Sequence, residues 1–133
     1  MHTILKELAV GEYDEAVTPP PGITALLCVA AERSLSSSRI PYHRVPMEGG
    51  QAIPGRQLLE AAEWIHLMAL SGRRILLFSS RGESRAPSVA VAYLCLKRGL
   101  AFGQALETVA RTMHSLQLVP GLAVSIEEAL SLG

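Results

Sequence analysis

Cysteines, net charge and long apolar runs are all scarce in this sequence. Its two cysteines, Cys28 and Cys95, lie in apolar stretches, which predicts buried, unpaired thiols in a reducing, cytoplasmic environment. Twelve basic residues balance twelve acidic ones, so no overall field attracts nucleic acid or an anionic membrane. The longest apolar run, from Val89 to Leu96, spans about eight residues, too few to cross a bilayer. The N-terminal residues also lack the pattern of a secretory signal.

Metal-ligand patterns are absent as well. The four histidines, His2, His43, His66 and His114, are far apart along the chain, and no two share a helical turn. Zinc sites in proteins draw on ligands at short, characteristic spacings. The sequence therefore predicts no metal site, and we expect no cofactor.

What is present is the composition of an ordinary globular protein. Hydrophobic residues make up 49% of the 133 residues and charged residues 18%. These values suit a chain that buries a core, and they differ from those of a disordered chain. No internal repeat or linker divides the sequence, so we expect a single domain over residues 1–133.

Strand-like and helix-like patterns alternate along the chain. Residues 23–31 and 75–78 are continuously apolar, as in strands buried on both faces of a sheet. A short strand pair with Gly11 in its turn is expected at the N-terminus. A further strand is expected over 42–46. Helices are predicted over 57–70, from about Pro87 to Arg98, over 103–113 and after Pro120-Gly121. This alternation predicts an α/β fold with a mostly parallel central sheet flanked by helices.

The segment that joins the apolar strand 75–78 to the next helix is the candidate site. A short strand-to-helix loop directs successive backbone N–H groups into one concavity, where the helix N-terminus adds positive potential. Gly82 permits backbone angles that other residues resist, and Arg85 can offer a two-pronged fork to an oxyanion. The spacing alone fits an ordinary turn with a surface arginine equally well. The predicted phosphate-binding residues are Ser79, Ser80, Arg81, Gly82, Glu83, Ser84 and Arg85.

The loop resembles the signature loop of cysteine-dependent protein tyrosine and dual-specificity phosphatases. Their pattern is His-Cys, any two residues, Gly, any two residues, Arg, then Ser or Thr. The resemblance covers nearly the whole chain, including the segment 42–50 that leads into the general-acid loop and the helix pair over 88–113. It implies the fold of these phosphatases. The ligands it implies are a phosphorylated protein or peptide, or inorganic phosphate or sulfate.

Four positions that carry the family's chemistry depart from its pattern. Ser79 stands where the family has its nucleophilic cysteine, and a hydroxyl without a neighbouring base stays protonated. Phe78 replaces the histidine before it, and Ala86 replaces the hydroxyl residue after the arginine. The general-acid position is Gly49, which leaves the adjacent Glu48 as a weak candidate for the acid.

These departures favour a catalytically inactive member of the family, a pseudophosphatase. An engineered trap would replace only the nucleophile, whereas Phe78, Gly49 and Ala86 differ as well. Phe-Ser at the His-Cys positions also resembles the substitution in phosphatase-like pseudoenzymes that bind signalling proteins. We therefore predict a protein that binds phosphorylated residues without hydrolysis. Two alternatives stay open: a phosphatase with trapped or residual activity, and an interaction scaffold whose loop is a relic.

Charged residues near the loop permit two interpretations. Glu83 would repel phosphate if it pointed inward, although its position faces outward in the family. Arg81 could offset that charge, or the two side chains could simply form a surface pair. Four further basic residues near the loop in sequence could favour acidic or phosphorylated partners, or form a solvated rim. They are Arg73, Arg74, Lys97 and Arg98.

Overall fold

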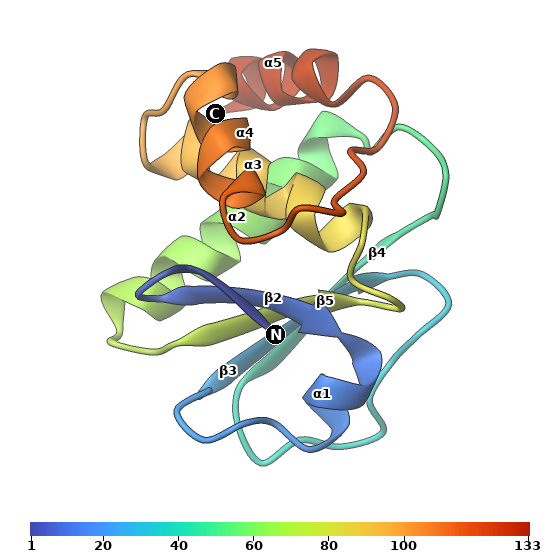
Figure 1. Ribbon diagram of the computed structural model, residues 1–133, viewed down its shortest axis with the longest axis vertical. Helices are drawn as coiled ribbons and strands as arrows, with labels where there is room; N and C mark the ends of the chain where they lie inside the picture. The colour runs from blue at the N-terminus through green and yellow to red at the C-terminus, as the bar shows by residue number, and fades with distance from the viewer.

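The computed structural model describes residues 1–133 as a five-stranded sheet with helices on both of its faces (Figure 1). The strands are β1 (His2–Leu5), β2 (Leu8–Glu12), β3 (Ala25–Ala30), β4 (Tyr42–Met47) and β5 (Ile75–Ser79). Their order in the sheet is β1-β2-β5-β3-β4. Strands β1 and β2 are antiparallel, and every other neighbouring pair is parallel. The expected α/β architecture with a mostly parallel sheet is confirmed.

The helices cover the two faces of the sheet unequally. They are α1 (Tyr13–Val17), α2 (Gly55–Leu70), α3 (Arg85–Lys97), α4 (Phe102–Ala110) and α5 (Leu122–Leu132). Figure 1 shows α2 to α5 stacked above the sheet, while the short α1 and long loops lie below it. None of these helices has the length and apolar content needed to cross a membrane.

Side chains of the central strands pack into two separate hydrophobic cores, one on each face of the sheet. On β5, Ile75 and Leu77 belong to the large cluster beneath α2 to α5, whereas Leu76 and Phe78 belong to a smaller cluster on the α1 face. This division follows from the alternation of side chains along a strand. Every residue of β5 is buried because both faces are covered, which explains the continuous apolar run.

The N-terminal strand pair turns at a different place from the one expected. Strands β1 and β2 pair as predicted, but the chain turns at Lys6 and Glu7, and Gly11 lies inside β2. A methyl group on Gly11 would lie 2.6 Å from a carboxylate oxygen of Glu15 and 3.0 Å from Leu76 Cδ1. The prediction of Gly11 as the turn residue was wrong, because this glycine serves close packing instead.

The helix that follows the candidate loop ends within one residue of the predicted position, Arg98. Helix α3 ends at Lys97, and Gly99 adopts a positive φ of 70°, as glycines that stop helices commonly do. Pro87 lies in the first turn, where its missing N–H costs no helical hydrogen bond. The remaining predicted helices are confirmed to within a few residues at each end.

Candidate functional site

The candidate loop lies where the central strand β5 ends and α3 begins. It borders a cavity of about 260 Å³ whose lining contains no hydrophobic residue. All seven residues from Ser79 to Arg85 take part in this lining, together with residues from two other loops and one later segment. These others are Glu32, Gly49, Gly50 and Gln117. The fold thus gathers the whole predicted loop around one polar hollow.

Most backbone N–H groups of the loop have no acceptor within the protein. The N–H groups of residues 80, 81, 83, 84 and 85 make no hydrogen bond to backbone or side chain, whereas that of Gly82 donates to Ser79 Oγ at 3.2 Å. Backbone N–H groups in proteins need acceptors, from water or a ligand if not from the chain. Five donors beside the start of a 13-residue helix form a concavity suited to an oxyanion.

Gly82 is required by the shape of this loop. Its φ is +74°, a conformation that residues with a side chain rarely adopt. A methyl group at this position would lie 2.8 Å from the carbonyl carbon of Gly11 and closer still to its oxygen. The loop therefore packs directly against the backbone of β2, and only glycine fits between them.

Arg85 is buried, with 10% of its side chain exposed, and it is anchored on one edge. Its Nη1 donates to Glu32 Oε1 at 2.6 Å and to the Met47 carbonyl at 2.8 Å, and its Nη2 donates to Glu32 Oε2 at 2.5 Å. A guanidinium has five N–H donors, so these bonds leave two, at Nε and Nη2, along one edge of the group. Arg85 can still grip an oxyanion with two parallel hydrogen bonds.

Glu32 is the only carboxylate besides Glu83 in the cavity lining. Its hydrogen bonds from Arg85 lower its pKa from 4.5 to about 2, so it is ionised at neutral pH. The same bonds raise the pKa of Arg85. Glu32 therefore holds the guanidinium in place and offsets its charge, and it has no proton to give to a leaving group.

Ser79, which the resemblance places at the nucleophile position, is buried. Ser79 is 2% exposed, and no carboxylate or imidazole is hydrogen-bonded to its hydroxyl. Phe78 is fully buried, with its ring centroid 6.4 Å from that of Tyr13, so it packs where a histidine would hydrogen-bond. Ala86 is fully buried in the large core. Phe78 and Ala86 pack in the two cores, and the Ser79 hydroxyl accepts the hydrogen bond from the Gly82 N–H.

Gly49 lies against the guanidinium of Arg85. A methyl group on Gly49 would be 3.6 Å from Arg85 Cζ, so the general-acid position of the resemblance does face the cavity. Glu48 is exposed and does not line the cavity. The position is therefore close to the loop but carries no acid.

The other charged residues considered from sequence fall into two places. Arg81 and Glu83 are exposed, and no ion pair joins them. The four basic residues at 73, 74, 97 and 98 do not border the loop, because they lie at the opposite ends of β5 and α3 and line a different cavity. Of the two interpretations left open from the sequence, a patch beside the loop does not fit their position.

Three residues of the cavity were missed by sequence reasoning: Glu32, Gly50 and Gln117. Glu32 lies two residues after the end of β3, and β3 pairs in parallel with β5. The carboxyl ends of these two strands therefore meet at the same edge of the sheet, which could have predicted that Glu32 lies near the loop. Gln117 lies at the cavity because its backbone N–H donates a hydrogen bond to the Glu83 carbonyl at 2.9 Å. No sequence pattern could have indicated that contact.

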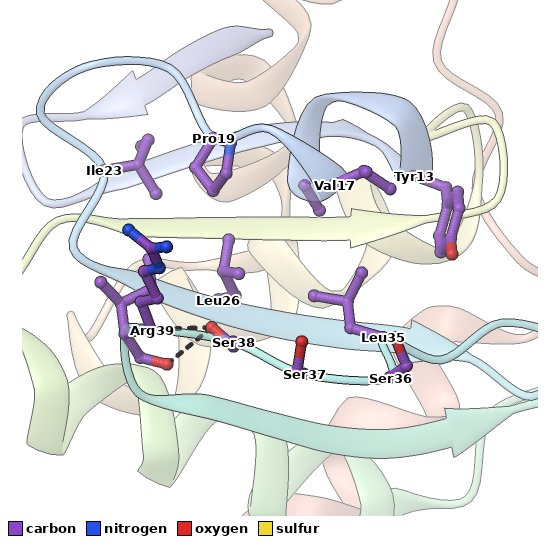
Figure 2. A pocket seen from close by; sticks show the side chains of 12 residues that line it. Tyr13, Val17, Pro19, Ile23, Leu26, Leu35, Ser36, Ser37, Ser38 and Arg39 are labelled. Carbon is purple, nitrogen blue, oxygen red and sulfur yellow. Dashed lines mark hydrogen bonds between the residues drawn. The ribbon is translucent and has the colours of Figure 1, made fainter.

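A second hollow adjoins the loop on the α1 face of the sheet. It measures about 470 Å³ and lies between α1 and residues 35–40, above Leu26 of β3 (Figure 2). Tyr13, at one end of this hollow, donates its N–H to the Ser80 carbonyl at 3.2 Å. Arg33 links the same two residues, since its guanidinium lies 4.6 Å from the Tyr13 ring centroid and its Nε donates to Ser80 Oγ. Tyr13 and Arg33 thus connect the loop of the polar cavity with this hollow, whose lining mixes apolar and polar residues.

Comparison with known proteins identifies the fold. No protein-family model and no curated protein matches the chain by sequence. Among solved structures, Tk-PTP in its active form has a TM-score of 0.84 at 21% identity, with 98% of this chain and 95% of that one covered. The human tyrosine phosphatase-like serine/threonine/tyrosine-interacting protein has a TM-score of 0.83 at 19% identity, with coverages of 99% and 96%.

A mouse protein assigned as a dual specificity phosphatase, solved with zinc tungstate, is also similar. Its TM-score is 0.82 at 18% identity, with 98% of this chain and 86% of that one covered. The chain therefore has the fold of dual-specificity and tyrosine phosphatases, as the resemblance of its loop implied.

Proposed function

We propose that this protein is a pseudophosphatase, a single domain over residues 1–133 that binds a phosphorylated residue of a partner protein in its loop and does not hydrolyse it. The observation that carries the proposal is the set of five loop N–H groups without acceptors beside the two remaining donors of Arg85. Phosphate offers several acceptor oxygens to such a set. The binding half of a phosphatase site is present here.

The catalytic half of such a site is missing from the same cavity. Transfer of a phosphoryl group to the protein needs an activated nucleophile, and the Ser79 hydroxyl has no base beside it. Departure of the leaving group is helped by a general acid, and Glu32 is held ionised by Arg85. Gly49 supplies no substitute. Bound phosphate would therefore persist.

The adjoining hollow on the α1 face supports a peptide as the ligand. A phosphorylated side chain in the polar cavity would place neighbouring peptide residues over Tyr13 and Arg33, at the edge of a mostly apolar hollow. Apolar pockets with a few polar groups are the usual sites for such side chains. The two unpaired cysteines support a cytoplasmic location, where thiols stay reduced.

The test of phosphate binding is a calorimetric titration with a phosphotyrosine peptide and with tungstate, a phosphate-like oxyanion. We expect saturable binding that weakens by about 100-fold in Arg85→Ala, because two charge-assisted hydrogen bonds are lost. The matched control is Arg81→Ala, which removes an exposed arginine of the same loop and should leave the affinity nearly unchanged. Absence of heat at millimolar ligand would make the loop a relic and favour the scaffold alternative.

The alternative of a trapped phosphatase is tested by Ser79→Cys. This variant restores the thiol at the nucleophile position, and we expect no turnover of an aryl phosphate because Phe78, Gly49 and Ala86 remain. The measurement is release of the phenolate over hours, with the unmodified protein as the blank. Turnover by Ser79→Cys alone would contradict the pseudophosphatase proposal and support the trap.

A further inference from the structure

A large basic cavity lies at the far end of β5 and α3 from the loop. Its volume is about 750 Å³, and it is formed by the β1–β2 turn, the end of α2 and the end of α3. In Figure 1 these three segments gather at one side of the molecule, opposite the loop between β5 and α3. Its lining residues are Lys6, Glu7, His66, Ala69, Leu70, Gly72, Arg73, Arg74, Tyr93, Lys97 and Arg98.

Positive charge is concentrated in this cavity to an unusual degree. Five of the twelve basic residues of the chain line it, against one of the twelve acidic residues. That acidic residue, Glu7, pairs with Arg98 at 2.6 Å and also accepts a hydrogen bond from Tyr93. The remaining four cations have no acidic partner. A protein with no net charge thus carries four uncompensated positive charges around one hollow.

Two of these cations are held in position by the fold. Arg73 donates to the Thr24 carbonyl at 3.0 Å, and Arg74 donates to Thr3 Oγ1 at 2.6 Å. Both acceptors are uncharged, so they fix the guanidinium groups without cancelling their charge. Lys6 and Lys97 make no side-chain hydrogen bond and can adjust to a ligand. Like charges held together repel one another, and a bound anion relieves that repulsion.

We propose that this cavity binds a compact anion that carries two or more phosphate groups. Four uncompensated cations call for several negative charges on one small ligand, and guanidinium and ammonium groups are the common protein partners of phosphate. The volume lies in the usual range for small-ligand sites. Of the two aromatic rings in its lining, Tyr93 is 1% exposed and offers no face on which a nucleic-acid base could stack, and His66 is half-buried.

This site is separate from the phosphate-binding loop. Helix α3 has 13 residues and runs from Arg85 at the loop to Lys97 at the basic cavity, which places the two about 20 Å apart. The proposal therefore does not depend on the proposed function of the loop. One phosphate group cannot reach both places.

Clustered phosphates could be free in solution or belong to a lipid headgroup. Leu67 and Leu70 are 58% and 72% exposed, and Leu70 lies in the cavity lining. Exposed leucines beside basic residues are also found where proteins rest on lipid surfaces. A free anion and a lipid headgroup would present the same clustered phosphate groups to the cavity. The experiment therefore includes one arm for each source.

The test is a titration of the full chain with inorganic tripolyphosphate, followed by calorimetry at low salt. We expect saturable binding that weakens at least about tenfold in Lys6→Ala/Lys97→Ala, since two charge contacts are lost. Arg111→Ala is the matched charge control, because it removes an exposed cation that directly follows α4 and lies outside the cavity. Because the loop is itself proposed to bind phosphate, the titration is repeated in Arg85→Ala, where the binding that remains belongs to the basic cavity. Absence of binding in Arg85→Ala, or an equal loss in Arg111→Ala, would overturn the proposal.

Two further arms define the ligand. Binding of a Glu-rich octapeptide as tight as that of tripolyphosphate would overturn the assignment to phosphate groups. Sedimentation with vesicles that contain phosphatidylinositol bisphosphate is compared with the soluble inositol trisphosphate headgroup. Tighter binding to vesicles, lost in Leu67→Ser/Leu70→Ser, identifies the lipid source. Equal affinity for headgroup and vesicle identifies the free anion, and both outcomes support the proposed site.

Discussion

Helix α3 joins the two proposed anion sites, and their positive groups differ in kind. At its N-terminus, one buried arginine is already paired with Glu32, and the donors left over are mainly backbone N–H groups. Around its C-terminus, four cations lack acidic partners and the backbone plays no visible part. We therefore expect binding at the first proposed site to depend on the path of the backbone, and binding at the second to depend on charge. The variants below separate these two kinds of recognition.

The largest effect is expected from a change in the backbone of the loop. Gly82→Ala adds a side chain at a positive φ and forces it against Gly11, which should lower the free energy of unfolding by about 3 kcal/mol. Gly50→Ala is the control, since Gly50 also has a positive φ, of 72°, but open space around it. Denaturant unfolding of both variants checks the comparison. Equal losses would mean that the contact with Gly11 is unimportant.

A smaller effect is expected from a change in the shape of the cation at the loop. Arg85→Lys keeps the charge but cannot form two parallel hydrogen bonds, so tungstate affinity should fall by about tenfold. Arg81→Lys, at an exposed position of the same loop, should change it little. Calorimetric titrations measure both. If Arg85→Lys binds as tightly as the unmodified protein, the charge of residue 85 and not its geometry determines binding.

Salt should affect the two sites unequally. Exposed charges are screened by added salt, whereas buried donors are screened much less. We therefore expect tripolyphosphate affinity at the basic cavity to fall several-fold more than tungstate affinity at the loop as salt rises from low to physiological ionic strength. Parallel titrations of the Arg85→Ala and Lys6→Ala/Lys97→Ala proteins isolate the two sites. Equal salt dependence would contradict the contrast between them.

The smallest effect concerns the Arg85–Glu32 pair. Because the pKa of Glu32 falls from 4.5 to about 2 on folding, the pair stabilises the protein above pH 4.5 and loses that contribution as pH falls towards 2. Half of the Glu32 side chain is exposed, so solvent screening limits the effect to less than about 1 kcal/mol.

Unfolding by urea at several pH values checks this prediction. The unmodified protein should lose stability between pH 4.5 and 2 to a greater extent than Glu32→Gln, which has no carboxylate to protonate. Glu107→Gln, from an exposed pair on α4, serves as the control and should follow the unmodified protein closely. Identical acid dependence in all three proteins would show that the Arg85–Glu32 pair contributes nothing.

Local patterns were sufficient for most of the fold. The apolar runs of β3 and β5 predicted buried strands because a sheet covered on both faces leaves no polar position along them. The stop at Gly99 and the break at Pro120-Gly121 placed the ends of α3 and the start of α5. Gly11 was wrongly predicted as a turn residue. The sequence shows that this residue has no side chain, but it does not show which atoms of Glu15 and Leu76 pack against its backbone.

The candidate site was only partly accessible from sequence. Spacing placed the loop from Ser79 to Arg85, and the resemblance placed Gly49 beside it. Glu32 is 53 positions from its partner Arg85, and no local pattern links them. The basic residues at positions 73, 74, 97 and 98 looked like neighbours of the loop because only β5, of 5 residues, precedes the loop and only α3, of 13 residues, follows it before they are reached.

The sequence by itself determined the composition of the loop, the presence of serine at position 79 and the succession of strands and helices. These properties are local, since they depend on residue types and on hydrophobic spacing within a few turns. Only the tertiary structure decided that Glu32 accepts hydrogen bonds from two of the five N–H donors of Arg85. The same holds for the five basic residues that line one cavity at the far end of α3. A single strand or helix carries the chain from one end of the molecule to the other. Charged residues on either side of such an element are therefore near in sequence but far apart in space, and residues far apart in sequence can lie together.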